Sequence, residues 1–327
     1  MRNLEPISSG QIASANAVEQ IERLQRAVET VIKGKPEAIR LAIVTLMAGG
    51  HLLVEDVPGV GKTTLAHALA RALHCNFQRI QFTSDLLPSD VIGLSVYNQH
   101  SGVFEWKPGP VFANVVLADE INRTTPKTQS ALLEAMNEYQ VTVDRDSFPL
   151  PQPFLVIATQ NPVEHHGTYP LPESQLDRFL IRAHMSYPEG QSERQILRSE
   201  AGAARLDDVR PVLTGADVLF IQDEVTRVQV DESLVEYALK IVALTRESTY
   251  LSLGVSPRGS MALYRSAQAL AMLESRTFTT PEDFKSLAVH VFAHRVVIGG
   301  RYSSTLKKAD QAEEILRDII ESVPVPV

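Results

Sequence analysis

The sequence predicts an α/β fold with a parallel central sheet, followed by a smaller all-helical domain. Residues 52–54, 115–118 and 154–158 are short apolar runs, the pattern of parallel strands that are buried on both faces. Residues 64–73, soon after the first run, repeat apolar side chains at helical spacing. Beyond about Ser186 strand patterns stop and only helical periodicity remains, which marks the second domain.

The remaining elements follow from local patterns along the chain. Amphipathic helices are expected at residues 17–31 and 36–48, and a strand is expected at 77–82. Residues 94–110 are rich in turn residues and aromatics, and residues 140–151 alternate valines with polar neighbours, so two inserted hairpins are predicted. Later helices are expected at 218–228, 232–246, 260–274 and 281–293, with a mostly helical region at 302–321.

Residues 51–64 (HLLVEDVPGVGKTT) join a buried strand to a helix through a loop punctuated by glycine, and this order predicts a phosphate-binding loop. Glycines let the main chain approach an anion closely, and the helix N-terminus adds unpaired N–H donors. Lys62 is expected to reach the β- and γ-phosphates of ATP, and the Thr63 hydroxyl is expected to bind Mg²⁺. Asp56 stands where the strict pattern G-x-x-x-x-G-K-[ST] has glycine, so the fit is imperfect. The predicted nucleotide-binding residues are Val57, Pro58, Gly59, Val60, Gly61, Lys62, Thr63 and Thr64.

Two adjacent carboxylates end a second apolar strand, in residues 114–123 (NVVLADEINR). Open α/β sheets bind ligands at the carboxyl ends of their strands, where Asp119 can hold Mg²⁺ together with Thr63. Glu120 points differently, so it can orient and deprotonate an attacking water as the general base. Taken with the loop, these acids predict an ATPase whose cofactors are ATP and Mg²⁺.

Three further motifs make the chain resemble the AAA+ ATPases, and more narrowly the MoxR family. They are IATQNP at residues 157–162, YPLPESQLDRF at 169–179 and GVSPR at 254–258. By this resemblance Asn161 matches the sensor 1 residue, Arg178 the arginine finger and Arg258 the sensor 2 arginine, all with catalytic roles. A planar, permanently charged guanidinium suits the charge that develops on the γ-phosphoryl oxygens.

The resemblance also implies a domain plan. An AAA+ P-loop αβα sandwich would occupy residues 1–185, with inserted hairpins at about 94–110 and 140–151, and an α-helical lid would occupy residues 186–327.

The resemblance implies partners as well. In AAA+ rings Arg178 would act on the nucleotide of the neighbouring subunit, so a homo-oligomer, expected to be a nucleotide-dependent hexamer, becomes a catalytic requirement. MoxR proteins are regarded as chaperone-like ATPases that work with von Willebrand factor A domain proteins in client maturation or metal-cofactor insertion. Two alternatives remain, a nucleic-acid motor and a nucleotide-gated scaffold without turnover. The complete set of site residues counts against the scaffold.

Composition narrows these choices. The 327-residue chain has a formal net charge of -8 and no run of five or more basic residues, which counts against nucleic acid as a partner. The sequence predicts neither a signal peptide nor a membrane span, so a cytoplasmic location is expected. Tyr97, Phe104 and Trp106 have two readings: they grip a client in the pore of a ring, or they pin the first inserted hairpin.

Overall fold

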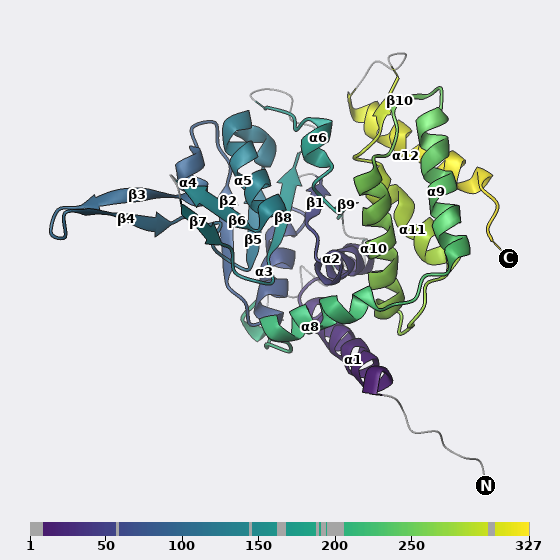
Figure 1. Cartoon of the computed structure of the whole chain (residues 1–327), viewed down its shortest axis with the longest axis horizontal. Coiled ribbons are helices and arrows are strands. Elements are labelled where there is room, and N and C mark those ends of the chain that lie inside the picture. The colour runs from purple at the N-terminus through teal and green to yellow at the C-terminus, as the bar shows by residue number, and fades with distance from the viewer. Residues whose placement is uncertain are drawn as a thin grey trace, which may run out of the picture.

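The computed structural model contains a five-stranded parallel sheet with helices on both faces, and a helical region beside it (Figure 1). It describes residues 9–56, 59–143, 146–161, 168–187, 190, 194, 206–299 and 305–326. The predicted fold class is confirmed. In spatial order the strands are β2 (Phe77–Gln81), β5 (Val115–Asp119), β8 (Leu155–Gln160), β1 (Leu52–Glu55) and β9 (Ile181–Ala183), with every neighbouring pair parallel.

The two faces of the sheet pack into two separate apolar clusters. Because successive side chains of a strand point to opposite faces, Leu52 and Val54 join one cluster while Leu53 joins the other. The three central strands are covered on both faces, which explains their unbroken apolar runs. The first cluster contains α1 (Ser9–Glu29), α2 (Pro36–Met47) and α3 (Lys62–Ala72), and the second contains α5 (Pro126–Glu138). Shorter helices are α4 (Pro88–Ile92), η1 (Ile121–Arg123) and α6 (Glu173–Leu176).

Two antiparallel hairpins are inserted near one edge of this sheet: β3 (Gly93–Asn98) with β4 (Val103–Pro108), and β6 (Gln140–Val143) with β7 (Asp146–Pro149). Figure 1 shows the β3–β4 hairpin projecting away from the body of the molecule. Trp106 stacks on Phe148 of the other hairpin, with ring centroids 3.9 Å apart. Tyr97 and Phe104 contact each other near the hairpin tip and remain 53% and 72% exposed. Trp106 therefore anchors the β3–β4 hairpin by packing against Phe148, whereas Tyr97 and Phe104 are exposed to solvent.

The C-terminal region is built from five helices of the described ranges and the short η2 (Leu206–Asp208). Side chains cap several of them, as where Thr214 and Asp217 form a capping box that starts α8. An antiparallel pair of very short strands, β10 (Leu251–Leu253) and β11 (Val297–Ile298), interrupts the helices, and strands of this length leave no periodic signal. The helices are α8 (Gly215–Thr226), α9 (Glu232–Glu247), α10 (Pro257–Leu273), α11 (Pro281–Phe292) and α12 (Thr305–Ser322).

The longest helices of the described ranges are α1, with 21 residues, and α12, with 18. Both carry many polar side chains. Within the ranges that the structure describes, no helix combines the length and the apolar character needed to cross a membrane.

Candidate active site

The segment between β1 and α3 presents main-chain donors around an open space. Gly61 is the N-cap of α3 with φ 101°, and Gly59 has φ 86°, both in the left-handed region that favours glycine. A Cβ at Gly59 would meet no described atom within 4 Å. Among the described residues, no side chain caps the first turn of α3, so its N–H groups can receive an anion. Val57 and Pro58 lie outside the described residues, and Val60 packs into the apolar core.

Asp56, the residue that departs from the glycine pattern, anchors the start of this loop. Its carboxylate accepts the backbone N–H of Met185 at 2.6 Å and that of Ser186, just beyond β9. Its carbonyl oxygen accepts a hydrogen bond from Nζ of Lys62 at 2.7 Å. Burial lowers the pKa of Lys62, while the negative charges of Asp56 and of the two adjacent acids at the end of β5 act to raise it. The loop is thus held at both ends by contacts that sequence reasoning did not foresee.

Asp119 and Glu120 lie at the carboxyl end of β5, and both are held by neighbouring strands. Thr159 of β8 donates to Asp119 Oδ1 at 2.6 Å and accepts the backbone N–H of Glu120 at 2.9 Å. Arg79 of β2 donates to Asp119 Oδ2 at 2.6 Å. Glu120 has φ 58°, a left-handed conformation that turns its side chain away from the direction of Asp119. This turn gives the two carboxylates separate surroundings.

The side chain of Glu120 is also engaged. Gln81 of β2 donates to Glu120 Oε2 at 2.7 Å, and Arg123 Nε lies 3.3 Å from the same oxygen. Both partners approach the carboxylate that the sequence assigns to proton abstraction. A water that hydrogen-bonds to Glu120 Oε2 would share that oxygen with these two partners.

The structure brings most of the predicted site residues to one cavity of about 370 Å³. Asn161, which follows β8 directly, lines it and is 7% exposed. The cavity volume lies in the range of about 300–1,000 Å³ that is usual for ligand sites. Its lining residues are Gly59, Gly61, Lys62, Thr63, Thr64, Arg79, Gln81, Asp119, Glu120 and Asn161.

The donor set fits a nucleoside triphosphate with Mg²⁺. Thr63 and Asp119 offer hydroxyl and carboxylate oxygens, the hard ligands that Mg²⁺ prefers beside phosphate oxygens and water. Lys62 and the open glycine loop supply positive charge and N–H donors for phosphates. The individual roles of these residues stay predictions, because the fit concerns their chemistry and their common location.

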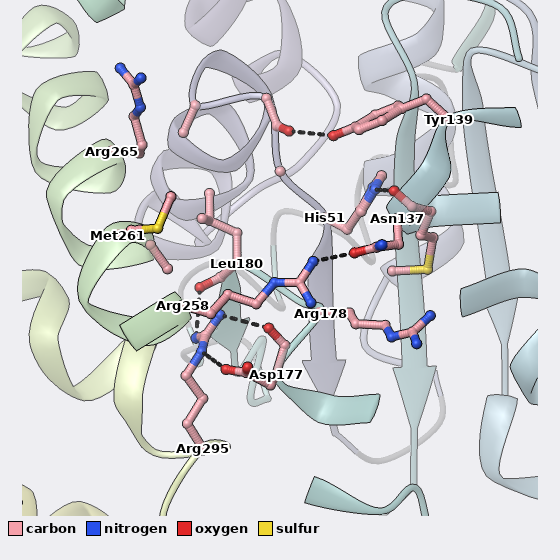
Figure 2. A pocket seen from close by; sticks show the side chains of 15 residues that line it. His51, Asn137, Tyr139, Asp177, Arg178, Leu180, Arg258, Met261, Arg265 and Arg295 are labelled. Atoms are coloured by element: carbon pink, nitrogen blue, oxygen red, sulfur yellow. Dashed lines mark hydrogen bonds and ion pairs between the residues drawn. The ribbon is translucent and has the colours of Figure 1, made fainter. Parts of the chain in front are cut away.

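Arg178 and Arg258 line a different pocket, of about 200 Å³, between the sheet domain and α10. Arg178 follows α6 and donates to the carbonyl oxygen of Leu133 at 2.6 Å. Arg258 lies in the first turn of α10, is exposed, and donates to Asn137 Oδ1 (Figure 2). The two predicted arginines are therefore gathered together, and they are separated from the phosphate-loop cavity.

Sequence reasoning missed Arg79, Gln81 and Thr159, the side chains that hold the two acids. Arg79 and Gln81 are two residues apart on β2, and their strand pairs with β5 so that Gln81 lies opposite Asp119. The sequence shows that Arg79 and Gln81 are two residues apart, a spacing that places both side chains on the same face of a strand. The adjacency of β2 and β5, which are separated by the inserted β3–β4 hairpin, was not visible in the sequence.

Comparisons with known proteins identify the family. Residues 51–181 match the model of the ATPase family associated with various cellular activities (AAA), and residues 243–319 match the AAA lid domain. The chain is 37% identical over 321 residues to Chaperone MoxR1 of Mycobacterium tuberculosis, covering 95% of this chain and 84% of that protein. It is 49% identical over 311 residues to protein YeaC of Bacillus subtilis, covering 95% and 94%. A crystal structure of a Cytophaga hutchinsonii protein classed as an ATPase matches with a TM-score of 0.88 and 39% identity, covering 98% of each chain. The chain belongs to the MoxR family of AAA+ ATPases.

Proposed function

We propose that this protein hydrolyses ATP in a Mg²⁺-dependent reaction within an oligomeric ring, and that hydrolysis drives the remodelling of partner proteins. Lys62 and the loop N–H groups bind the β- and γ-phosphates, while Thr63 and Asp119 hold Mg²⁺. The bound cation neutralises charge on the phosphate oxygens. Family membership and the cavity that gathers these residues support the assignment.

Glu120 is the proposed general base. It orients a water molecule and takes its proton, and Asn161 helps to fix that water or the γ-phosphate. A hydrogen bond from Gln81 and an ion pair with Arg123 hold the Glu120 carboxylate in the present arrangement.

The observation that carries the proposal of a ring is the separation of Arg178 and Arg258 from the phosphate-loop cavity. Both arginines line a pocket at the junction with α10, and Arg258 is exposed. An arginine finger is worth roughly 10³–10⁵ in rate, so a site without one is nearly inactive. We infer that these residues of one subunit complete the nucleotide site of the next, and that the ring is a nucleotide-dependent hexamer.

The remodelling role is supported by the relative named Chaperone MoxR1 and by the exposed aromatics of the β3–β4 hairpin. Tyr97 and Phe104 offer an apolar contact for a client, whereas Trp106 is occupied in packing. The proposed partners are von Willebrand factor A domain proteins, and the proposed task is client maturation or metal-cofactor insertion. The proposed location is the cytoplasm. We keep residues 1–185 as the proposed AAA+ core and residues 186–327 as the proposed lid.

The test is ATP hydrolysis per subunit as a function of protein concentration, with mass measured by light scattering with and without nucleotide and Mg²⁺. Turnover should rise as the protein assembles, because each site needs a neighbour. Turnover that is independent of concentration in a monomer would overturn the proposal of composite sites.

A further inference from the structure

A buried ion pair crosses the junction between the sheet domain and the helical region, directly beside the two arginines. Arg295, which follows α11, donates from Nε to Asp177 Oδ1 at 2.8 Å, and the two residues are 118 positions apart in the chain. The side chain of Arg295 is 2% exposed and that of Asp177 is 20% exposed. Figure 2 shows Arg295 against Asp177, with Arg258 just above them.

Arg295 also binds the main chain that carries Arg178. Its guanidinium donates to the carbonyl oxygens of Asp177, Phe179 and Leu180, the residues on either side of Arg178. His294 Nε2 forms a further hydrogen bond with the carbonyl oxygen of Phe179 at 3.0 Å. A buried guanidinium that makes several hydrogen bonds of fixed direction leaves this segment little freedom.

The same carboxylate reaches the helix that carries Arg258. Ser256 Oγ lies 3.1 and 3.2 Å from the two Asp177 oxygens, and it accepts the N–H of Gly259 as the N-cap of α10. A Cβ at Gly259 would lie 2.6 Å from Val255 Cγ1 and 3.0 Å from Arg295 Cδ, so the lack of a side chain at this position lets Arg295 pack closely against the start of α10. Asp177 therefore links the segment of Arg178 to the first turn of α10.

We propose that Asp177 and Arg295 are positioning residues, which together with Ser256 hold Arg178 and Arg258 in one fixed arrangement for the nucleotide of the next subunit. This inference rests on the proposed role of Arg178 and Arg258 at the subunit interface. Neither Asp177 nor Arg295 needs to touch the nucleotide. Their action is to keep two cations, carried by different parts of the fold, on the same face.

The pocket also has the charge balance of an anion site. Arg178, Arg258, Arg265 and Arg295 line it, and Asp177 is the carboxylate among its lining residues. His51 lines the same pocket and adds no charge at neutral pH, because burial lowers its pKa to about 4. The carboxylate of Asp177 is already paired with Arg295. The other arginines therefore give the pocket an excess of positive charge, which can attract a polyphosphate.

The test uses the double variant Asp177→Asn/Arg295→Met, which removes both charges and so avoids leaving a buried charge without its partner. The full-length variant should bind ATP like the wild type through its own phosphate loop, but turn it over at least about 10-fold more slowly, a part of the full effect of an arginine finger. Mixed with Glu120→Gln subunits it should regain turnover, because those subunits present an intact arginine face to its intact Glu120.

A matched control is Asp283→Asn/Arg276→Met, which removes a buried ion pair that lies wholly within the helical region. This control should retain turnover wherever it folds. Wild-type turnover in Asp177→Asn/Arg295→Met would overturn the inference. Loss of turnover that Glu120→Gln subunits do not restore would also overturn it, provided that Arg178→Ala is restored in a parallel mixture. If Arg178→Ala is not restored either, the proposed interface role of Arg178 fails, and this inference fails with it.

Discussion

Protonation of His51 is predicted to lower the free energy of unfolding as the pH falls. The ring lies just before β1 and is 3% exposed. Its Nδ1 accepts the backbone N–H of Val156 at 3.1 Å, so Nε2 carries the proton and donates to the carbonyl oxygen of Met136 at 3.0 Å. A second proton on Nδ1 would face the N–H of Val156 and place a positive charge in a buried site near Arg258.

The magnitude follows from the pKa. Burial lowers the pKa of His51 from 6.5 in the unfolded chain to about 4 in the fold. Because the unfolded chain binds the proton first, the stability contribution is complete above pH 6.5 and is lost as the pH falls toward about 4. The whole shift corresponds to at most about 3 kcal/mol, and about 2 kcal/mol of it should be lost by about pH 5.

The assay is urea unfolding of the wild type and of His51→Gln at several values between about pH 7 and about pH 5. Glutamine keeps one donor and one acceptor but does not titrate in this range. The wild type should lose about 2 kcal/mol more than the variant over this interval. His294, whose pKa is also well below its usual value because of burial, is present in both proteins and cancels from the difference. Parallel pH profiles would refute the reasoning.

Three further predictions test the site and the hairpin. Lys62→Ala should raise the Kd for ATP about tenfold or more, because charge-assisted hydrogen bonds are lost; titration calorimetry measures this, and unchanged affinity would remove Lys62 from the phosphate site. Glu120→Gln should bind ATP yet lower kcat by about 10²–10⁴, the usual contribution of a general base, in a steady-state assay; retained turnover would exclude it as the base. Trp106→Ala should lower the free energy of unfolding by about 2 kcal/mol, since its stacking is lost. Phe104→Ala should change it by less than about 0.5 kcal/mol, and equal effects on urea unfolding would contradict the division between packed and exposed rings.

Much of the fold could be predicted from local sequence patterns, because each helix and strand is specified mainly by residues that lie close together in the chain. The strand and helix around Lys62, the apolar strand before Asp119 and the helices of the C-terminal region were all readable from periodicity. Helix α10 begins at Pro257 rather than at residue 260, because Ser256 caps it. A serine followed by proline is a start signal that the apolar period alone does not register.

Contacts between distant segments were not readable. Arg79 meets Asp119 only because β2 lies beside β5, and Asp56 binds residues beyond β9. The pairing of Asp177 with Arg295 spans most of the C-terminal half of the chain. The sequence shows which side chains are available for such contacts. The order of the strands in the sheet and the docking of the helical region determine which of these side chains come together.

The central claim, that each nucleotide site is completed by Arg178 of a neighbour, is tested most directly by mixing two inactive variants. Arg178→Ala and Glu120→Gln subunits are combined in equal amounts before assembly, and ATP turnover is compared with that of each variant alone. In random rings about one interface in four joins an intact Glu120 to an intact Arg178, so the mixture should reach about a quarter of wild-type turnover. A mixture no more active than the average of its two components would contradict the account.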